Sequence, residues 1–239
     1  MIASLTFGEH PLPGFLFPLA LLAAWLTGSI PFGFFAGRIK GIDIRDHGSG
    51  NIGATNVLRV IGKPWGFTVF CLDVLKGLVP VLACRWVAPQ EAPWSFLPIA
   101  AAVAAILGHN YTPWLRFRGG KGIATSAGAF AGLSPVAVAV AVLAWLAIFA
   151  LTRYVAVASI VGAIMLSLTV GVLCLLDPGT SPALLGLSLL VTFLAVWRHR
   201  SNIARLRAGT ENRFGRPQKT PCATTTAPTS SPPSSTSHD

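Results

Sequence analysis

Charged residues are scarce in this sequence of 239 residues. They make up 11% of the chain, whereas hydrophobic residues make up 53%, and soluble domains usually contain about 25% charged residues. The apolar residues lie in blocks long enough to be tested as membrane spans, which need about 20 residues each. The composition therefore predicts an integral membrane protein rather than a soluble globular domain.

Paired cysteines are also missing. Cys71, Cys84 and Cys174 lie in apolar runs, and Cys222 lies in a polar stretch. No Cys-x-x-Cys spacing occurs, so neither a zinc site nor a disulfide framework is expected. No other metal-binding cluster is visible, so we expect no cofactor and an activity that a chelator leaves unchanged. No basic region precedes the first apolar block, so a cleaved signal peptide is not expected.

Two motifs of acyl-transfer chemistry are absent. None of His10, His47, His109 and His199 is followed five residues later by Asp. This disfavours the thioester-using acyltransferases that carry His-x4-Asp. The sequence also lacks Gly-x-Ser-x-Gly, so a serine acyl-enzyme has no support.

Seven apolar blocks predict an all-α integral membrane protein with seven transmembrane helices. The sequence GLSP, from Gly132 to Pro135, divides one long apolar stretch, because Gly followed by Ser-Pro ends one helix and starts the next. The predicted spans are Phe15–Ala36, Trp65–Val87, Ser95–Leu107, Ile123–Leu133, Pro135–Leu151, Val155–Leu176 and Ala183–Trp197.

Basic residues are distributed unevenly around these blocks. The formal net charge of +10 is typical of nucleic-acid-binding proteins, but here the basic residues lie between apolar blocks, so we expect no nucleic-acid partner. Sixteen of the 18 Lys and Arg residues fall on one side of the predicted spans. This bias predicts an N-terminus outside the cell and a C-terminus in the cytoplasm. We expect residues 1–216 to form the membrane domain, and residues 217–239, rich in Ser, Thr and Pro, to be a disordered tail.

The first polar loop contains DHGSGNIGATNVLR, from Asp46 to Arg59, which matches Gly-x-Gly-x-x-Gly. A dinucleotide site would need a strand before the loop and a βαβ unit around it, and neither is predicted here. Glycines still let successive backbone N–H groups point at one anion. A plain connecting loop is the alternative, but the density of donors favours anion binding. The candidate residues are Gly48, Gly50 and Gly53, the donors Ser49, Asn51, Thr55 and Asn56, and the flanking Arg45 and Arg59.

Two later segments repeat this chemistry. The loop RFRGGKG contains Lys121 among Gly119, Gly120 and Gly122, but it is not a Walker A loop, since it lacks the first Gly and the final Ser or Thr. After the last block, His199 and Asn202 share one face if the helix continues, because they are three residues apart. His109 and His199 are the two candidate general bases.

Asp73 and Lys76 stand three residues apart inside the second apolar block. Charges at membrane depth are costly, so such residues usually pair with each other or serve a function. We expect a mutual pair near the bundle interior, and a substrate role is the alternative.

Together these segments resemble the bacterial acyl-phosphate–glycerol-3-phosphate acyltransferase family, PlsY. The resemblance lies in GSIPFGFFAGRIKGIDIRDHGSGNIGATNVLR, LDVLKG, GHNYTPWLRFRGGKGIAT and HRSNIARLRAGTENRF, and it covers most of the chain from Gly28 to Phe214. It implies a seven-helix enzyme that transfers a fatty acyl group from acyl-phosphate to the 1-hydroxyl of sn-glycerol 3-phosphate. The products would be 1-acylglycerol 3-phosphate (lysophosphatidate) and inorganic phosphate, in the first acylation step of phospholipid synthesis.

The resemblance also implies roles for individual residues. It assigns catalytic roles to Ser49, Arg59, Lys121, His199 and Asn202, and its glycines match those of the two loops. We expect the protein to act as a monomer in the bacterial inner membrane, in contact with membrane lipid, with its site facing the cytoplasm.

A transporter or channel for organophosphates is the competing hypothesis. No inverted repeat pairs the two glycine loops, which disfavours it. Phosphate release that depends on both substrates would support the enzyme, whereas uptake into sealed vesicles without turnover would support the transporter.

Overall fold

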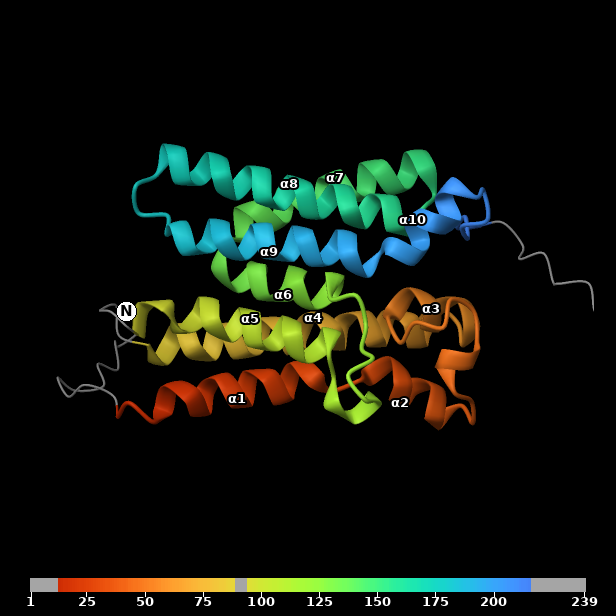
Figure 1. Cartoon of the computed structure of the whole chain (residues 1–239), viewed down its shortest axis with the longest axis horizontal. Helices are drawn as coiled ribbons and strands as arrows, with labels where there is room; N and C mark the ends of the chain where they lie inside the picture. Colours follow the sequence, from red (N-terminus) through yellow and green to blue (C-terminus); the bar gives the residue numbers. More distant parts are fainter. Residues whose placement is uncertain (1–12, 89–93, 216–239) are drawn as a thin grey trace, which may run out of the picture.

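The computed structural model describes residues 13–88 and 94–215 (Figure 1), and within them every regular element is a helix. The predicted tail, residues 217–239, lies outside the described residues. The α-helices are α1 (Leu16–Ser29), α2 (Phe32–Ile39), α3 (Ala54–Val60), α4 (Lys63–Val87), α5 (Leu97–Asn110), α6 (Ile123–Leu133), α7 (Pro135–Thr152), α8 (Val155–Leu176), α9 (Pro182–Arg198) and α10 (Arg200–Arg207). Short 3₁₀ turns cover Ile44–Asp46, Trp94–Phe96 and Pro113–Leu115.

Within residues 13–88 and 94–215, four stretches are long and apolar enough to cross a membrane. They are Leu16–Ile39, which comprises α1 and α2, and the helices α4, α7 and α8. The bent pair α9–α10 would make a fifth. Helices α5 and α6 have 14 and 11 residues, which is short for a bilayer that needs about 20. The described part of the chain is therefore all-helical, and several of its helices are long and apolar enough to span a membrane.

The first predicted span is broken. Helix α1 ends at Ser29, and α2 begins at Phe32 after Ile30 and Pro31. Proline disfavours the α conformation of the residue before it, and Ile30 accordingly has an extended ψ of 117°. The carbonyls freed by this break accept hydrogen bonds from other segments, including one of 2.8 Å from the Nζ of Lys76 to the oxygen of Ile30.

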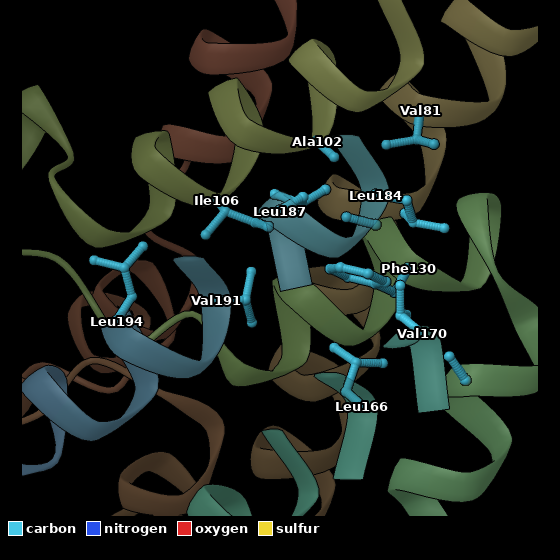
Figure 2. Close-up of a cluster of buried hydrophobic side chains, with 12 residues drawn as sticks. Val81, Ala102, Ile106, Phe130, Leu166, Val170, Leu184, Leu187, Val191 and Leu194 are labelled. Carbon is cyan, nitrogen blue, oxygen red and sulfur yellow. The ribbon is translucent and has the colours of Figure 1, made fainter. Parts of the chain in front are cut away.

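The helices form two groups with α6 between them. Figure 1 shows α1, α4 and α5 on one side and α7, α8 and α9 on the other. Apolar residues from both groups and from α6 meet in one core, which Figure 2 shows around Phe130, Leu166, Leu187 and Val191. The short α6 therefore joins the two halves of the bundle.

Close packing of α4 against α6 depends on glycine. A Cβ added at Gly77 would collide with the carbonyl of Thr125, and one added at Gly128 would collide with the carbonyl of Val74. Small residues let helix backbones approach closely, which is the usual means of helix association in membranes. This contact fixes the start of α6, and with it the loop that carries Lys121.

The polar segments gather at one end of the bundle. Figure 1 shows α2, α3 and α10 at that end. The start of α1 and the turn between α8 and α9 lie at the opposite end. The first glycine loop, which precedes α3, and the segment that forms α10 are thus brought to one region although most of the chain lies between them in sequence.

Candidate functional site

A cavity of about 370 Å³ opens where these polar segments meet. Its walls come from the glycine loop, α3, α4, the end of α5, the loop before α6 and the start of α6, α7, α8, α10 and the segment after α10. Of the residues predicted for the site, eleven line it: Ser49, Asn51, Gly53, Thr55, Asn56, Arg59, His109, Lys121, Gly122, His199 and Asn202.

The glycine loop is held in shape by Asn56, which is fully buried at 1% exposure. Its Oδ1 accepts a 2.8 Å hydrogen bond from the backbone N–H of Ser49, and its Nδ2 donates to the carbonyls of Ile44 and His47 at 3.2 and 3.0 Å. Gly48 has a φ of 61°, a left-handed conformation that favours glycine. The amide of Asn56 therefore shapes the loop and places Ser49 at the cavity.

Arg45 does not line the cavity, although its position beside the loop suggested that it would. Its guanidinium is paired with Asp43, with a nitrogen–oxygen distance of 2.6 Å. This hydrogen-bonded guanidinium holds the pKa of the Asp43 carboxyl well below its usual range. Arg45 therefore belongs to an exposed ion pair on the flank of the loop.

Lys121 reaches the cavity from the second loop and connects it to α10. Its Nζ donates to Oδ1 of Asn202, and Nδ2 of Asn202 donates to Oε1 of Glu211 at 2.6 Å. The other oxygen of Glu211 accepts from Nε of Arg205 at 2.7 Å. Burial lowers the pKa of Lys121 to about 8, although the Glu211 carboxylate opposes that shift. At pH 7 the lysine is still mainly a cation.

Arg59 adds a second cation from α3. Its guanidinium is half-buried, and burial lowers its pKa from the usual 12.5. An arginine remains charged in proteins even when its pKa is lowered in this way. The cavity therefore contains two positive charges contributed by separate segments of the chain.

His199 lies at a break between α9 and α10, which meet at an angle of 51°. The helix thus does not continue straight through this point, but His199 and Asn202 both line the cavity. Burial lowers the pKa of His199 to about 4, so the ring is neutral at pH 7. Its Nδ1 lies 2.7 Å from the carbonyl of Ala195 and must donate the proton, since a carbonyl only accepts. Nε2 is therefore the unprotonated, accepting nitrogen.

Gly119 and Gly120 support the second loop without lining the cavity. Their N–H groups donate to the carbonyls of Asn110 and His109 at 3.2 and 3.1 Å, and their own carbonyls accept from Arg198. A Cβ on Gly120 would collide with the ring of His109. Arg198 therefore hydrogen-bonds this loop to the end of α9. It is also one of the basic residues on which the predicted membrane orientation rests. Gly48 and Gly50 likewise lie outside the cavity lining.

The expected pairing of Asp73 with Lys76 is confirmed. Asp73 Oδ1 lies 2.7 Å from the Nζ of Lys76, and both side chains are almost fully buried. Nδ1 of His109 lies 3.7 Å from the same carboxylate oxygen. Asp73 and His109 both line the cavity, so the carboxylate and the imidazole add polar groups to its wall.

Several lining residues were missed by the sequence analysis. Glu211 lies in an otherwise basic segment, and an isolated acidic residue there was a usable signal. Trp145, Phe149 and Phe214 gave no signal that distinguishes them from ordinary apolar residues of a membrane helix or its flank. They supply aromatic walls next to the charged groups, so the cavity suits an amphiphile that carries phosphate.

No three His, Cys, Asp or Glu side chains converge into a metal-binding group within residues 13–88 and 94–215.

Comparison with known proteins places the chain in a family. The family model described as Glycerol-3-phosphate acyltransferase matches residues 18–209. A Glycerol-3-phosphate acyltransferase from Geobacter sulfurreducens is 45% identical over 191 residues, which cover 80% of this chain and 94% of the relative. A relative with the same description from Synechococcus elongatus is 46% identical over 202 residues, covering 81% and 92% of the two chains.

A solved structure agrees with this match. The crystal structure of PlsY, an integral membrane glycerol 3-phosphate acyltransferase, in its glycerol 3-phosphate form superimposes with a TM-score of 0.76 at 39% identity. It covers 84% of this chain and 96% of that chain. Fold, cavity and sequence thus agree, and the chain belongs to the PlsY-type glycerol-3-phosphate acyltransferase family.

Proposed function

We propose that this protein transfers a fatty acyl group from acyl-phosphate to the 1-hydroxyl of sn-glycerol 3-phosphate. The products are 1-acylglycerol 3-phosphate and inorganic phosphate. The observation that carries the proposal is one cavity that combines two partly buried cations, Arg59 and Lys121, with aromatic and aliphatic walls. Both proposed substrates carry phosphate, and the donor also carries a long apolar chain.

The phosphate groups bind where Ser49, Arg59 and Lys121 converge. Hydrogen bonds between ionised partners are stronger than neutral ones, and arginine can hold a phosphate through two parallel N–H groups. The Ser49 hydroxyl adds an uncharged donor at the rim of the glycine loop. Asn202 positions the ammonium of Lys121, to which it is hydrogen-bonded.

The reaction itself needs little covalent help from the protein. The 1-hydroxyl oxygen of glycerol 3-phosphate attacks the acyl carbonyl carbon, the bond from that carbon to the phosphate oxygen breaks, and phosphate leaves with the bonding electrons. An acyl-phosphate already carries a good leaving group. The protein therefore mainly holds the hydroxyl in place and neutralises the charge that develops on the phosphate.

His199 orients the attacking hydroxyl. Its accepting Nε2 can take a hydrogen bond from the substrate, but a pKa of about 4 makes the ring a weak base at neutral pH. The hydroxyl proton is passed to the departing phosphate, which is the stronger base. His199 thus has a positioning role more than that of a general base.

The membrane arrangement follows the basic-residue bias of the sequence. We infer seven spans, an N-terminus outside, a site open to the cytoplasm, and a monomeric enzyme in the bacterial inner membrane. The gathering of α2, α3 and α10 at one end of the bundle supports a single cytoplasmic mouth (Figure 1). Cytoplasmic substrates and membrane lipid then meet at the same cavity.

Phosphate release by the purified protein in detergent tests the proposal. We expect inorganic phosphate to appear only when acyl-phosphate and glycerol 3-phosphate are both present. Lys121→Ala should reduce the rate roughly 100- to 1,000-fold, since that is the usual cost of removing one donor to a developing anion. Lys63→Ala is the matched control, because Lys63 is exposed and does not line the cavity. Uptake into sealed vesicles without any turnover would instead favour an organophosphate transporter.

Replacing His199 with Ala separates its two possible roles. A positioning residue should leave measurable turnover and raise the KM for glycerol 3-phosphate. Loss of all turnover above background, with substrate binding intact, would contradict direct proton transfer to phosphate and make His199 the base.

A further inference from the structure

We propose that Asp73, Lys76 and His109 are positioning residues that hold the two glycine loops, residues 46–59 and 116–122, at a fixed separation across the cavity. They form the middle of a buried chain of contacts that runs from the first loop to the second. The inference rests on the proposed function, because it concerns how groups from both loops meet one phosphate.

The chain of contacts starts where α2 packs on the first glycine loop. A Cβ added at Gly33 would collide with the carbonyl oxygen of Ile52, so the backbone of α2 lies directly against the loop. Ala36 of α2 and Ile52 also belong to one buried apolar cluster. A shift of α2 would therefore displace the first loop.

Lys76 connects α4 to the start of α2. Its Nζ donates the 2.8 Å hydrogen bond to the carbonyl of Ile30 and lies 5.4 Å from the centroid of the Phe32 ring, in the first turn of α2. A cation is attracted to the face of an aromatic ring, and more strongly where both are shielded from water. The side chain of Lys76 is 2% exposed, so its charge acts on α2 with little screening.

Asp73 and His109 extend the chain of contacts to the second glycine loop. Oδ1 of Asp73 lies 2.7 Å from Nζ of Lys76 and 3.7 Å from Nδ1 of His109. The ring of His109 in turn occupies the space that a side chain on Gly120 would fill, so the second loop packs on the imidazole. Since Gly120 directly precedes Lys121, the position of the ring influences that of the ammonium group.

The two loops supply different groups to the same cavity. Ser49 and Arg59 come from the first loop and α3, whereas Lys121 comes from the second loop. Under the proposed function a phosphate binds where these groups converge, so a changed separation of the loops weakens binding and misaligns the reactants. A role that only kept the protein folded would reduce the amount of active enzyme and leave the KM unchanged.

The test measures phosphate release with glycerol 3-phosphate as the varied substrate. Lys76→Met alone leaves the Asp73 carboxylate buried and uncompensated, which is strongly destabilising, whereas Asp73→Asn combined with Lys76→Met removes both charges and avoids that penalty. In the double variant we expect the KM to rise roughly tenfold, equivalent to one weakened charge-assisted hydrogen bond. We expect kcat to fall roughly 100-fold, the cost of a misplacement of about 1 Å.

Thr192→Val is the matched control for stability. Its hydroxyl donates a 2.7 Å hydrogen bond to the carbonyl of Ala163 and lies 2.7 Å from Oγ of Ser167, between α8 and α9, and Thr192 does not line the cavity. This variant should lower the midpoint of thermal unfolding and leave the KM for glycerol 3-phosphate unchanged.

A second pair of variants tests His109. His109→Ala removes the ring that packs against Gly120 and should raise the KM. His109→Phe keeps a ring at this position and should raise the KM less. Equal KM values in the two variants would contradict the positioning role, and they decide the matter if the Asp73 and Lys76 double variant fails to fold.

Two further results would overturn the inference. A folded double variant with the wild-type KM would show that the ion pair does not hold the loops, however far kcat falls. An equal rise of the KM in Thr192→Val would assign the effect to general loss of stability. Wild-type protein that releases no phosphate with both substrates would refute the proposed function and this inference together, whereas normal wild-type turnover with an unchanged KM in the variants would refute the inference alone.

Discussion

Lys121 meets two opposing requirements at the scale of a single residue. It must remain charged to attract phosphate, yet it is buried deeply enough that its pKa falls to about 8. Asn202 and Glu211 offset part of this cost through a continuous chain of hydrogen bonds. The lysine thus loses its charge within a pH range that an assay can reach.

The first prediction concerns pH. Lys121 is protonated well below pH 8 and neutral well above it, so phosphate binding should weaken as the pH rises. We expect the pH profile of kcat/KM for glycerol 3-phosphate to show a break near pH 8 and to fall by roughly tenfold per pH unit above it. This parameter reports the ionisation of groups in the free enzyme. In Lys121→Arg the break near pH 8 should disappear, whatever the absolute rate. A break retained in that variant would assign it to another group.

The second prediction concerns Glu211. Its carboxylate raises the pKa of Lys121 against the effect of burial. Glu211→Gln keeps a hydrogen-bonding side chain of the same shape but removes the charge, so the pH break should move to lower pH. The pH profile of kcat/KM measures the shift, with Glu211→Asp as the charged control. An unmoved break would mean that the carboxylate does not stabilise the ammonium.

At the scale of single residues, cavity-lining residues could be predicted from the sequence where the relevant pattern lies within one short segment. Ser49 and Lys121 were found because glycine and donor patterns can be read from a short segment, and both line the cavity. Arg45 was expected there too, but its guanidinium forms an ion pair with Asp43, two residues away, and does not line the cavity. Glu211 was missed because its part depends on contacts with Asn202 and Arg205 that only the fold creates.

At the scale of the element, the packing of α4 against α6 determines the position of the second glycine loop. Helix α6 begins directly after Gly122, and its position is set by the close approach of its backbone to α4. Any side chain that separates the two helices would also displace Lys121. Stability and activity should therefore be coupled through this contact.

The third prediction tests that contact. Gly128→Leu should lower the free energy of unfolding by roughly 1–3 kcal/mol, the usual cost of forcing extra volume into a packed interface. The midpoint of thermal unfolding in detergent reports the loss. Gly171→Leu is the control, since the nearest atom to an added Cβ there is a flexible leucine methyl group at 3.8 Å. Equal stability of the two variants would contradict the close-packing role.

Helix boundaries could be predicted where a strong signal stood in the sequence. The Ser-Pro pair gave the start of α7 at Pro135, as observed. The break at Pro31 was missed, because the apolar run continues through it and hides the proline. Helix α3 was also missed, since its seven residues are too few for a helical period to be recognised and tertiary contacts stabilise it. Helix α10 was considered only as a continuation of the last span, whereas it begins after a bend at His199.

At the scale of the whole molecule, the fourth prediction concerns orientation. In a variant without native cysteines, Pro178→Cys on the α8–α9 turn and Arg118→Cys on the second loop introduce single exposed thiols. A membrane-impermeant maleimide added to intact cells should label Pro178→Cys, and should label Arg118→Cys only after permeabilisation. The reverse pattern would invert the proposed topology.

The segment after α10 has a practical consequence for handling the protein. The backbone N–H of Phe214 donates to the carbonyl of Arg153 at 2.9 Å, and its ring forms part of the cavity wall. A fluorescent protein or purification tag fused directly after Gly215 would therefore begin at the rim of the substrate entrance. Such a fusion should slow turnover by steric obstruction, and a long spacer should restore it.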